Sequence, residues 1–192
     1  MSKKDCGENK DRCMKRRWYV MCTIPGKEQK AAALLEGRVS DTLWQDVRIL
    51  KKQQLFRTQG NYLLGRKDMF PGYIFVCTEF PEELADELKR ARQFPQLVGS
   101  RMDGLTPVEE TDLCFLENVC GKDLAHDMFL STVRVDEEGC VQSASGALEP
   151  YVGRITRQRL RHRYVTAEVE LFNRRENVLF GIRMEGDPVS FV

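Results

Sequence analysis

A strand joined to a dense run of arginines constrains this chain more than any other feature. From Val165 to Leu171 apolar and polar residues alternate strictly, which is the pattern of a half-buried strand. The segment before it holds five arginines within ten positions and no acid. Guanidinium groups suit planar, two-pronged contacts with phosphates and base edges. The run therefore predicts a nucleic-acid face on a rigid sheet, with the candidate contact residues Arg154, Arg157, Arg159, Arg161, His162 and Arg163.

A charge run is more often a solvated face than a binding site, and that alternative stays open. A run of one sign is less usual, because neighbouring cations repel one another unless a polyanion neutralises them. This favours RNA contact. Arg174 and Arg175 join the candidate set, although the adjacent Glu176 strengthens the solvated alternative for them. His162 either stacks on a base or is a plain turn residue.

The bulk composition indicates a soluble globular protein whose basic charge is local. Its 192 residues are 42% hydrophobic and 31% charged, and the formal net charge is only +1. A strongly basic coat protein is disfavoured, so affinity for nucleic acid must come from patches. Residues 1–17 carry seven Lys or Arg against three acids, and we expect them to form a disordered basic tail.

The cysteines and the apolar runs indicate the compartment. Seven cysteines form an odd set without a Cys-x-x-Cys pair, and there are only two histidines. We therefore expect reduced thiols, no metal and no cofactor. No apolar run approaches the ~18 residues of a membrane span, and the N-terminus lacks a signal-peptide core. The prediction is a cytoplasmic monomer with no membrane contact.

Strands and helices alternate between residues 18 and 121. Apolar runs of strand length occupy 18–24 and 73–77, and apolar stripes predict helices at 27–38 and from Pro81. A third helix is predicted to begin with a capping box and to end at Gly121; the box is Thr106, Pro107 and Glu109. Further strands are expected at 47–57, 62–64 and 96–99. The fold class is thus α+β, beginning with an α/β sandwich whose helices pack on a mainly antiparallel sheet.

The chain turns all-β after a linker at residues 122–132. Short strands with tight loops in residues 133–192 predict a small five-stranded, all-β barrel. Its strands are expected near 133–135, 140–142, 152–158, 164–172 and 178–184. A short turn joins the 152–158 and 164–172 strands, so we expect them to pair antiparallel. Arginines decorate both ends of this hairpin, and which end dominates RNA contact stays open.

Two sequence signatures stand in order along the chain. Lys-Arg-Arg-Trp-Tyr-Val at 15–20 and Phe-Pro-Gly-Tyr-Ile-Phe-Val at 70–76 resemble the amino-terminal (NGN) domain of NusG-type transcription factors. Ser-Gly-Ala-Leu-Glu at 145–149, followed by Val-Gly-Arg-Ile at 152–155, is similar to the KOW motif of the same family's second, SH3-like domain. The resemblance covers almost the whole chain beyond residue 15, and the two motifs together are specific.

The resemblance implies a non-enzymatic factor that rides on RNA polymerase. In the family, the first domain (18–121 here) binds the clamp helices of the largest subunit and suppresses pausing. The second domain (133–192 here) recruits a ribosome, a termination factor or RNA. A contact with the non-template DNA strand stays open. The residues that the resemblance and the aromatic pattern nominate for polymerase binding are Trp18, Tyr19, Phe70, Pro71 and Tyr73.

Two departures from the general factor are similar to the LoaP branch of the family. Ala147, Leu148 and Glu149 stand where the general factor has an aromatic-rich loop, and the arginine run is unusually heavy. In that branch the KOW domain binds a hairpin in nascent RNA and causes antitermination. A general elongation factor that recruits protein partners remains an alternative.

Four further alternatives accompany this interpretation. The alternative for the aromatic residues nominated for polymerase is that they belong to the core, since large aromatic side chains are usually buried. A ribosome-associated KOW protein that binds ribosomal RNA is a rival function. A thiol enzyme using Cys114 or Cys120 with His126 is another, without oxyanion-hole signals. Finally, the second domain of the RfaH branch becomes a helical hairpin, whereas β-branched residues such as Val165, Val169 and Val178 favour a stable barrel here.

Overall fold

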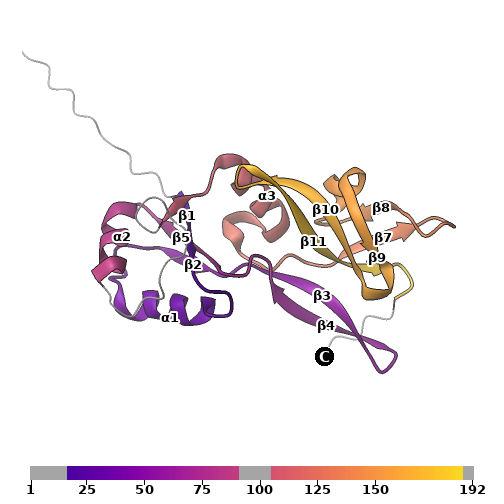
Figure 1. The fold of residues 1–192 in the computed structure, drawn as a ribbon, viewed down its shortest axis with the longest axis horizontal. Coiled ribbons are helices and arrows are strands. Elements are labelled where there is room, and N and C mark those ends of the chain that lie inside the picture. The colour runs from indigo at the N-terminus through magenta and orange to yellow at the C-terminus, as the bar shows by residue number, and fades with distance from the viewer. Residues whose placement is uncertain (1–16, 91–104, 188–192) are drawn as a thin grey trace, which may run out of the picture.

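The computed structural model describes residues 17–90 and 105–187. In Figure 1 a sheet with helices lies at one end of the long axis and a second, curled sheet lies toward the other. The predicted basic tail, apart from Arg17, and the predicted strand at 96–99 lie outside the described residues. No helix among the described residues is long and apolar enough to cross a membrane.

The first sheet is fully antiparallel and carries helices on both faces. Its strand order is β2 (Asp46–Arg48), β5 (Tyr73–Thr78), β1 (Arg17–Cys22) and β6 (Thr106–Pro107). One face buries Met21 and Ile74 against α1 (Glu28–Arg38) and α2 (Pro81–Arg90). The other face buries Trp18 and Phe75 with α3 (Glu110–Cys120). The expected α/β sandwich is confirmed.

The predicted start of the third helix is wrong. Thr106 and Pro107 pair with Val20 and Tyr19 of β1, and the N–H of Val108 donates to the Trp18 carbonyl at 2.9 Å. Helix α3 begins only at Glu110, without a side-chain cap. Edge strands accept proline, and the bonds to β1 hold these residues extended, so sheet pairing prevails over the local capping signal. Gly121 ends the helix as expected.

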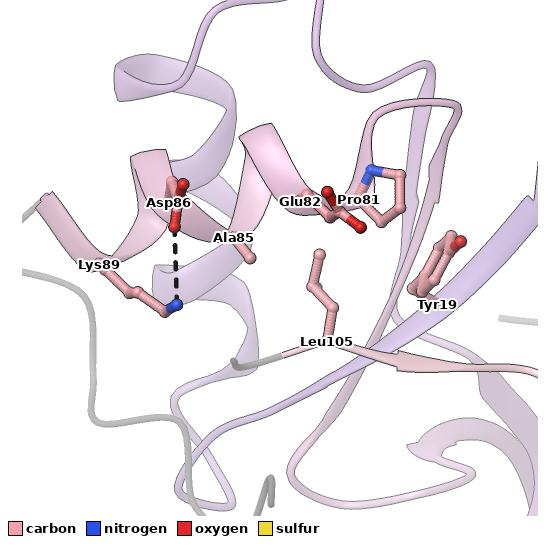
Figure 2. A pocket seen from close by; sticks show the side chains of 7 residues that line it. All are labelled: Tyr19, Pro81, Glu82, Ala85, Asp86, Lys89 and Leu105. Atoms are coloured by element: carbon pink, nitrogen blue, oxygen red, sulfur yellow. Dashed lines mark ion pairs between the residues drawn. The ribbon is translucent and has the colours of Figure 1, made fainter. Parts of the chain in front are cut away.

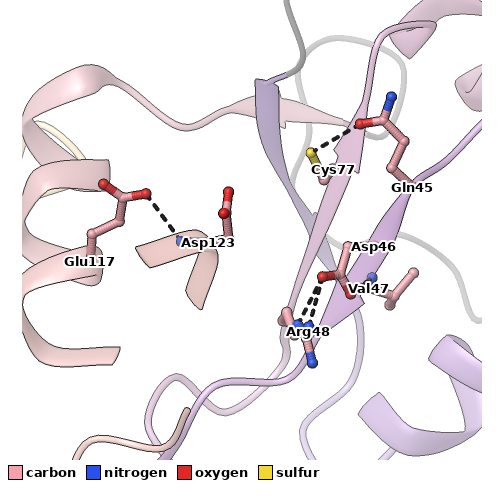
Figure 3. Close-up of polar contacts among 7 residues, drawn as sticks. All are labelled: Gln45, Asp46, Val47, Arg48, Cys77, Glu117 and Asp123. Carbon is pink, nitrogen blue, oxygen red and sulfur yellow. Dashed lines mark hydrogen bonds and ion pairs between the residues drawn. The ribbon is translucent and has the colours of Figure 1, made fainter. Parts of the chain in front are cut away.

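Short polar contacts fix the edge of this sheet (Figure 3). The guanidinium of Arg48 donates to the Asp46 carboxylate, with the closest N–O pair at 2.7 Å, and the N–H of Val47 donates to the same carboxylate at 2.8 Å. Cys77 Sγ lies 3.7 Å from Gln45 Oε1. The edge strand β2 is therefore held by its own side chains as well as by β5.

A long hairpin, β3 (Lys51–Thr58) and β4 (Asn61–Asp68), extends from the first sheet toward the second. The predicted linker, residues 122–132, is hydrogen-bonded to this hairpin. The N–H of Met128 donates to the Lys51 carbonyl, and the Met128 carbonyl accepts from the Gln53 N–H, both at 2.8 Å. The linker also contains a short helix, η1 (Lys122–Leu124). A Cβ on Gly181 would lie 2.1 Å from the Gln53 carbonyl oxygen, so the hairpin touches the second sheet backbone to backbone.

The second sheet is the predicted small barrel. Its strand order is β8 (Val141–Ser145), β7 (Ser131–Val135), β11 (Arg174–Met184), β10 (Tyr164–Leu171) and β9 (Ile155–Arg159). Only β7 and β11 pair in parallel, and the predicted antiparallel pairing of β9 with β10 is confirmed. Val165, Val169 and Phe180 fill the interior. Residues 131–184 form strands joined by turns and two short 3-10 helices, so the expectation of a barrel rather than a helical hairpin is confirmed.

Two local expectations in the barrel are corrected. Residues 152–154 belong to a 3-10 helix, η2 (Glu149–Arg154), and not to the strand that follows. Residues 174–176 belong to β11, because Phe172 and Asn173 both have positive φ, 53° and 59°, and make the whole turn between β10 and β11. Two consecutive left-handed residues are the geometry of a tight two-residue hairpin.

Candidate functional site

The barrel displays the arginine run on one exposed strand and the turn beyond it. Arg157 and Arg159 lie on β9, and Arg161 lies in η3 (Leu160–His162). Arg154 ends η2 just before the strand. All four side chains are exposed, and none of them forms an ion pair with an acid among the described residues. This group of four, the unpaired arginines, is an open cationic surface suited to phosphate.

Arg163 is placed differently from the sequence expectation. It is 9% exposed, and its guanidinium makes a two-pronged ion pair with Asp187 and donates to the Leu160 carbonyl. The same group lies 4.4 Å from the centre of the Tyr62 ring on the hairpin. Its backbone has φ of 53°, which turns the side chain inward after His162. Arg163 therefore connects the barrel to the β3–β4 hairpin, and its guanidinium is not accessible for RNA contact. His162, in contrast, is exposed.

The pair Arg174 and Arg175 differs from the unpaired arginines in having acid partners. Arg174 forms an ion pair with Glu176, and Arg175 lies 3.6 Å from the carboxylate of Glu168 across the strand pair. Both arginines are well exposed. Any phosphate would compete with these carboxylates, so this end of the hairpin is the weaker cationic surface.

The Phe-Pro-Gly-Tyr segment forms a tight turn that depends on its glycine. Gly72 has φ of 87°, and a Cβ there would lie 2.8 Å from the Thr23 carbonyl oxygen. Its N–H donates to the buried carboxylate of Glu28 at 2.6 Å. Burial raises the pKa of Glu28, but this bond and two other backbone N–H groups outweigh burial and hold the pKa below its usual value. Pro71 is exposed at the tip.

The rings that flank this turn are covered by the barrel. The centre of the Phe172 ring lies 5.7 Å from that of Phe70 and 5.7 Å from that of Tyr73, edge-to-face in both cases. Phe70 and Tyr73 also stack on each other at 6.2 Å. Part of the surface between the domains is a cavity of about 290 Å³ lined by these three rings and Lys52. The sequence-nominated aromatic pair thus packs against the chain's own second domain.

Phe172 was missed by sequence reasoning, and its partner Asp112 was missed too. The backbone N–H of Phe172 donates to Asp112 Oδ1 of α3 at 2.9 Å, and Asp112 is 4% exposed. A bulky residue with φ of 53° is strained, and this bond together with the ring contacts holds it. An aromatic at a hairpin turn was the available signal, but its contact lies about a hundred residues away in sequence.

The two remaining aromatic candidates differ in exposure. Trp18 is 5% exposed and belongs to the core, so the prediction that it anchors a partner is not supported and the core alternative accounts for it. Tyr19 is half-buried and lines a hollow of about 360 Å³ with Leu105 and the exposed face of α2, where Lys89 pairs with Asp86 (Figure 2). Only Tyr19 of these two presents surface to a partner.

Cys120, one of the two candidate thiols, lacks the properties of a catalytic cysteine. Cys120 is fully buried, and burial with the nearby charge of Asp127 raises the pKa of its thiol to about 12. A catalytic thiol needs a lowered pKa. His126 stacks on Phe129, with ring centres 4.5 Å apart, and its Nδ1 contacts the Asp127 carbonyl. Across residues 17–90 and 105–187 no cluster of three or more metal-binding side chains occurs.

Comparison with known proteins agrees with this architecture. The family model for transcription termination factor NusG matches residues 16–114. The transcription termination/antitermination protein NusG of Thermus thermophilus is 27% identical over 169 residues, which are 82% of this chain and 90% of that protein. A solved structure described as domain interaction in Thermotoga maritima NusG superposes with a TM-score of 0.53 at 19% identity, covering 88% of this chain and 94% of that one.

Proposed function

Because this chain belongs to the NusG family of transcription factors, we propose that it is a specialised antiterminator that binds RNA polymerase and a structured RNA. The first domain is the polymerase-binding part and the barrel is a KOW domain that binds an RNA hairpin. This is the division of labour of the LoaP branch. The observation that carries the RNA part is the group of four exposed, unpaired arginines.

The unpaired arginines suit an RNA stem-loop for electrostatic and geometric reasons. Arg157 and Arg159 are two residues apart on β9, so their Cβ atoms project from the same face of the strand, and Arg161 follows in the turn. A row of guanidinium groups on a rigid strand can follow a phosphate backbone. Exposed His162 adds a ring at the turn that can stack on an unpaired loop base. Arg174 and Arg175 extend the surface more weakly, since carboxylates already hold them.

Polymerase binding is assigned to the Phe-Pro-Gly-Tyr turn. NusG-family factors bind RNA polymerase, and we propose that Phe70, Pro71 and Tyr73, with Tyr19 nearby on β1, contact the clamp helices of its largest subunit. Rigid aromatic side chains make good interface anchors. In the structure Phe172 packs on two of these rings, so docking requires that the β10–β11 turn move off them.

Carrying the polymerase-binding site and the RNA-binding site on one chain would make the factor selective for particular transcripts. A transcript held by the barrel raises the local concentration of the docking domain near the polymerase that made that transcript. Antitermination then acts on operons whose leader RNA carries the hairpin. A general elongation factor would instead use the barrel for protein partners, and a ribosomal RNA-binding protein would have no use for the polymerase-docking turn.

The test compares two full-length variants with equal change in charge. Arg159→Glu/Arg161→Glu is expected to abolish binding of leader-derived RNA stem-loops and to leave polymerase binding intact, as measured by electrophoretic mobility shift and co-purification. Lys30→Glu/Arg38→Glu is the matched control, because both side chains are exposed on α1, which packs on the face of the first sheet that has no barrel residue in its core. Crosslinking in cells with sequencing of the bound RNA identifies the leader.

Each competing function has its own outcome in this test. Unchanged RNA affinity in the arginine variant would show that this surface is solvated. Recovery of ribosomes without polymerase would favour the ribosomal protein. No RNA binding by the wild-type chain, with normal polymerase binding, would leave a general elongation factor.

A further inference from the structure

A carboxylate is buried beside the Phe-Pro-Gly-Tyr turn, which is an unusual place for a charge. Glu28 is the first residue of α1, and it is only 3% exposed. Acidic side chains are almost never fully buried unless they are paired. Over residues 17–90 and 105–187, however, no Lys or Arg forms an ion pair with Glu28. The charge of this carboxylate must therefore be balanced by other groups.

Backbone N–H groups from two separate segments supply this balance. The Gly72 N–H donates to Glu28 Oε1 at 2.6 Å, and the N–H groups of Gly26 and of Glu28 itself also donate to the carboxylate. The start of a helix adds to this effect, because its unpaired N–H groups favour negative charge. One side chain thus joins the loop before α1 to a turn that lies 44 residues away in sequence.

The loop and the turn also contact each other directly through their backbones. The Thr23 N–H donates to the Gly72 carbonyl at 2.7 Å, so Gly72 uses both of its backbone polar groups in this contact. A Cβ on Gly72 would lie 3.4 Å from Pro25 Cγ, which shows how closely the loop lies against the turn. The exposed tip of the turn, Pro71, is therefore placed by residues of the loop and by the Glu28 carboxylate.

Stability alone is a poor reason for a buried charge at this position. An apolar side chain of similar volume is often as good as a buried ionised group, because it loses no hydration. Such a side chain could not accept a hydrogen bond from Gly72, whose buried N–H would then have no acceptor. What the Glu28 carboxylate contributes is a defined shape for the turn.

We propose that Glu28 is a positioning residue for polymerase binding, whose carboxylate holds the turn in the shape in which Phe70, Pro71 and Tyr73 dock. This inference rests on the proposed function, which assigns docking to the same turn. Glu28 is buried, so it acts through the Gly72 N–H and contacts no partner itself. A turn that is already held in its bound shape loses less conformational entropy on docking, which raises affinity.

The test is the full-length variant Glu28→Gln, which keeps the length of the side chain and one acceptor oxygen but removes the charge. Hydrogen–deuterium exchange of the Gly72 amide, measured relative to the amides of β5, should become about 10- to 150-fold faster, as expected for loss of a hydrogen bond to a charged group. Affinity for RNA polymerase should fall about tenfold, because only molecules with the turn in its bound shape can dock.

Leu88→Ala is the control for a general loss of stability. Leu88 of α2 is buried in the same core, but its side chain has no polar atom that could bond to the turn. This variant should lower the unfolding midpoint without changing the ratio of Gly72 exchange to β5 exchange. Its polymerase affinity should equal that of the wild-type chain below the unfolding transition.

Two more variants keep this inference separate from the proposed function. Glu28→Asp retains the charge at a shorter reach, and it should show both losses at smaller size even if Glu28→Gln fails to fold. Pro71→Asp puts a charge at the exposed tip and tests the docking turn directly. Normal polymerase binding by Pro71→Asp would refute the docking assignment, while the exchange ratio would still decide whether Glu28 holds the turn.

The inference fails on either of two results. One is weak polymerase binding by Pro71→Asp together with wild-type binding by the folded Glu28 variants, which would show that docking does not depend on this carboxylate. The other is the same exchange ratio for Gly72 in the Glu28 variants as in Leu88→Ala, which would reduce Glu28 to an ordinary contributor to stability.

Discussion

The two candidate binding surfaces differ in whether the protein itself covers them. One is the apolar surface at Phe70 and Tyr73, and the other is the cationic surface of the unpaired arginines. The apolar rings are covered by Phe172 of the same chain, while Arg154, Arg157, Arg159 and Arg161 stay open to water. Exposed apolar surface is unfavourable in water, so a partner-free chain gains by covering it. Guanidinium groups are well hydrated, so covering them brings no such gain in free energy. Under the proposed function, RNA would therefore meet a surface that is already exposed, whereas polymerase would have to displace part of the protein.

The largest expected effect is on stability, and it tests whether Arg163 has a structural role that the unpaired arginines do not have. Replacing Asp187 by Asn leaves the inward-facing Arg163 without its carboxylate, and breaking a buried ion pair lowers stability by about 3 kcal/mol. Urea unfolding of the full chain measures this loss. The matched control is Glu185→Gln, whose exposed pair with Arg134 should add little stability. Equal unfolding midpoints for the two variants would place Arg163 among the solvated arginines.

The same ion pair has a predicted pH dependence. Burial raises the pKa of Asp187, but hydrogen bonds from Arg163 and the Met184 N–H and the charge of Arg163 outweigh burial and lower the pKa below its ordinary value. A lowered folded-state pKa contributes stability that is present above the unfolded value and lost as the pH falls through the folded value. The wild-type chain should therefore lose more stability on acidification below about pH 4 than Asp187→Asn does.

Salt should affect the two surfaces very differently. Four arginine–phosphate contacts, at ~0.9 log unit per log unit of salt each, predict that RNA affinity falls about a hundredfold between 50 and 200 mM salt. Docking through aromatic rings should change little over the same range, since no ion pair is lost. Parallel titrations of RNA and polymerase at several salt concentrations check this. A flat RNA curve would contradict an arginine–phosphate interface.

Removing the cover should expose the apolar surface. Phe172→Ala deletes two aromatic pairs worth about 0.5–1.5 kcal/mol each beyond their burial, which favours separation of the domains. Polymerase affinity should rise about tenfold if the covered arrangement dominates, because the competent state becomes more populated. Phe129→Ala is the control, since this ring is 53% exposed. Unchanged polymerase affinity in Phe172→Ala would mean that docking does not use the covered rings.

Local sequence patterns predicted most helices and strands. Contacts between residues far apart in sequence determine which candidate side chains are exposed and which are buried. Alternation in β10 and the apolar stripe of α2 were sufficient to place these elements, because each signal lies within its own segment. The capping box at Thr106 failed because β1, far away in sequence, supplied better hydrogen bonds. The first sheet and the barrel were thus predictable, while the position of one on the other was not.

The same limit applies to the candidate site. The sequence identified the arginine run but not which members face water: Arg163 turns inward through a left-handed backbone and finds Asp187. Cross-strand register, invisible in composition, brings Glu168 to Arg175. Phe172 could not be foreseen as a cover, since its contacts with Phe70 and Tyr73 join the two halves of the chain.

The smallest expected effect tests whether an arginine's existing partner matters for RNA binding. Arg174→Ala/Arg175→Ala should weaken RNA binding only about two- to threefold, whereas Arg157→Ala/Arg159→Ala should weaken it at least tenfold. Arg174 and Arg175 must leave Glu176 and Glu168 to reach a phosphate, so their net gain on binding is small, as for exposed ion pairs generally. Both variants remove two positive charges, so an effect of net charge alone would weaken both equally. Equal losses measured by titration would mean that RNA senses the barrel's overall charge, and a larger loss for Arg174→Ala/Arg175→Ala would move the RNA surface to the β10–β11 end.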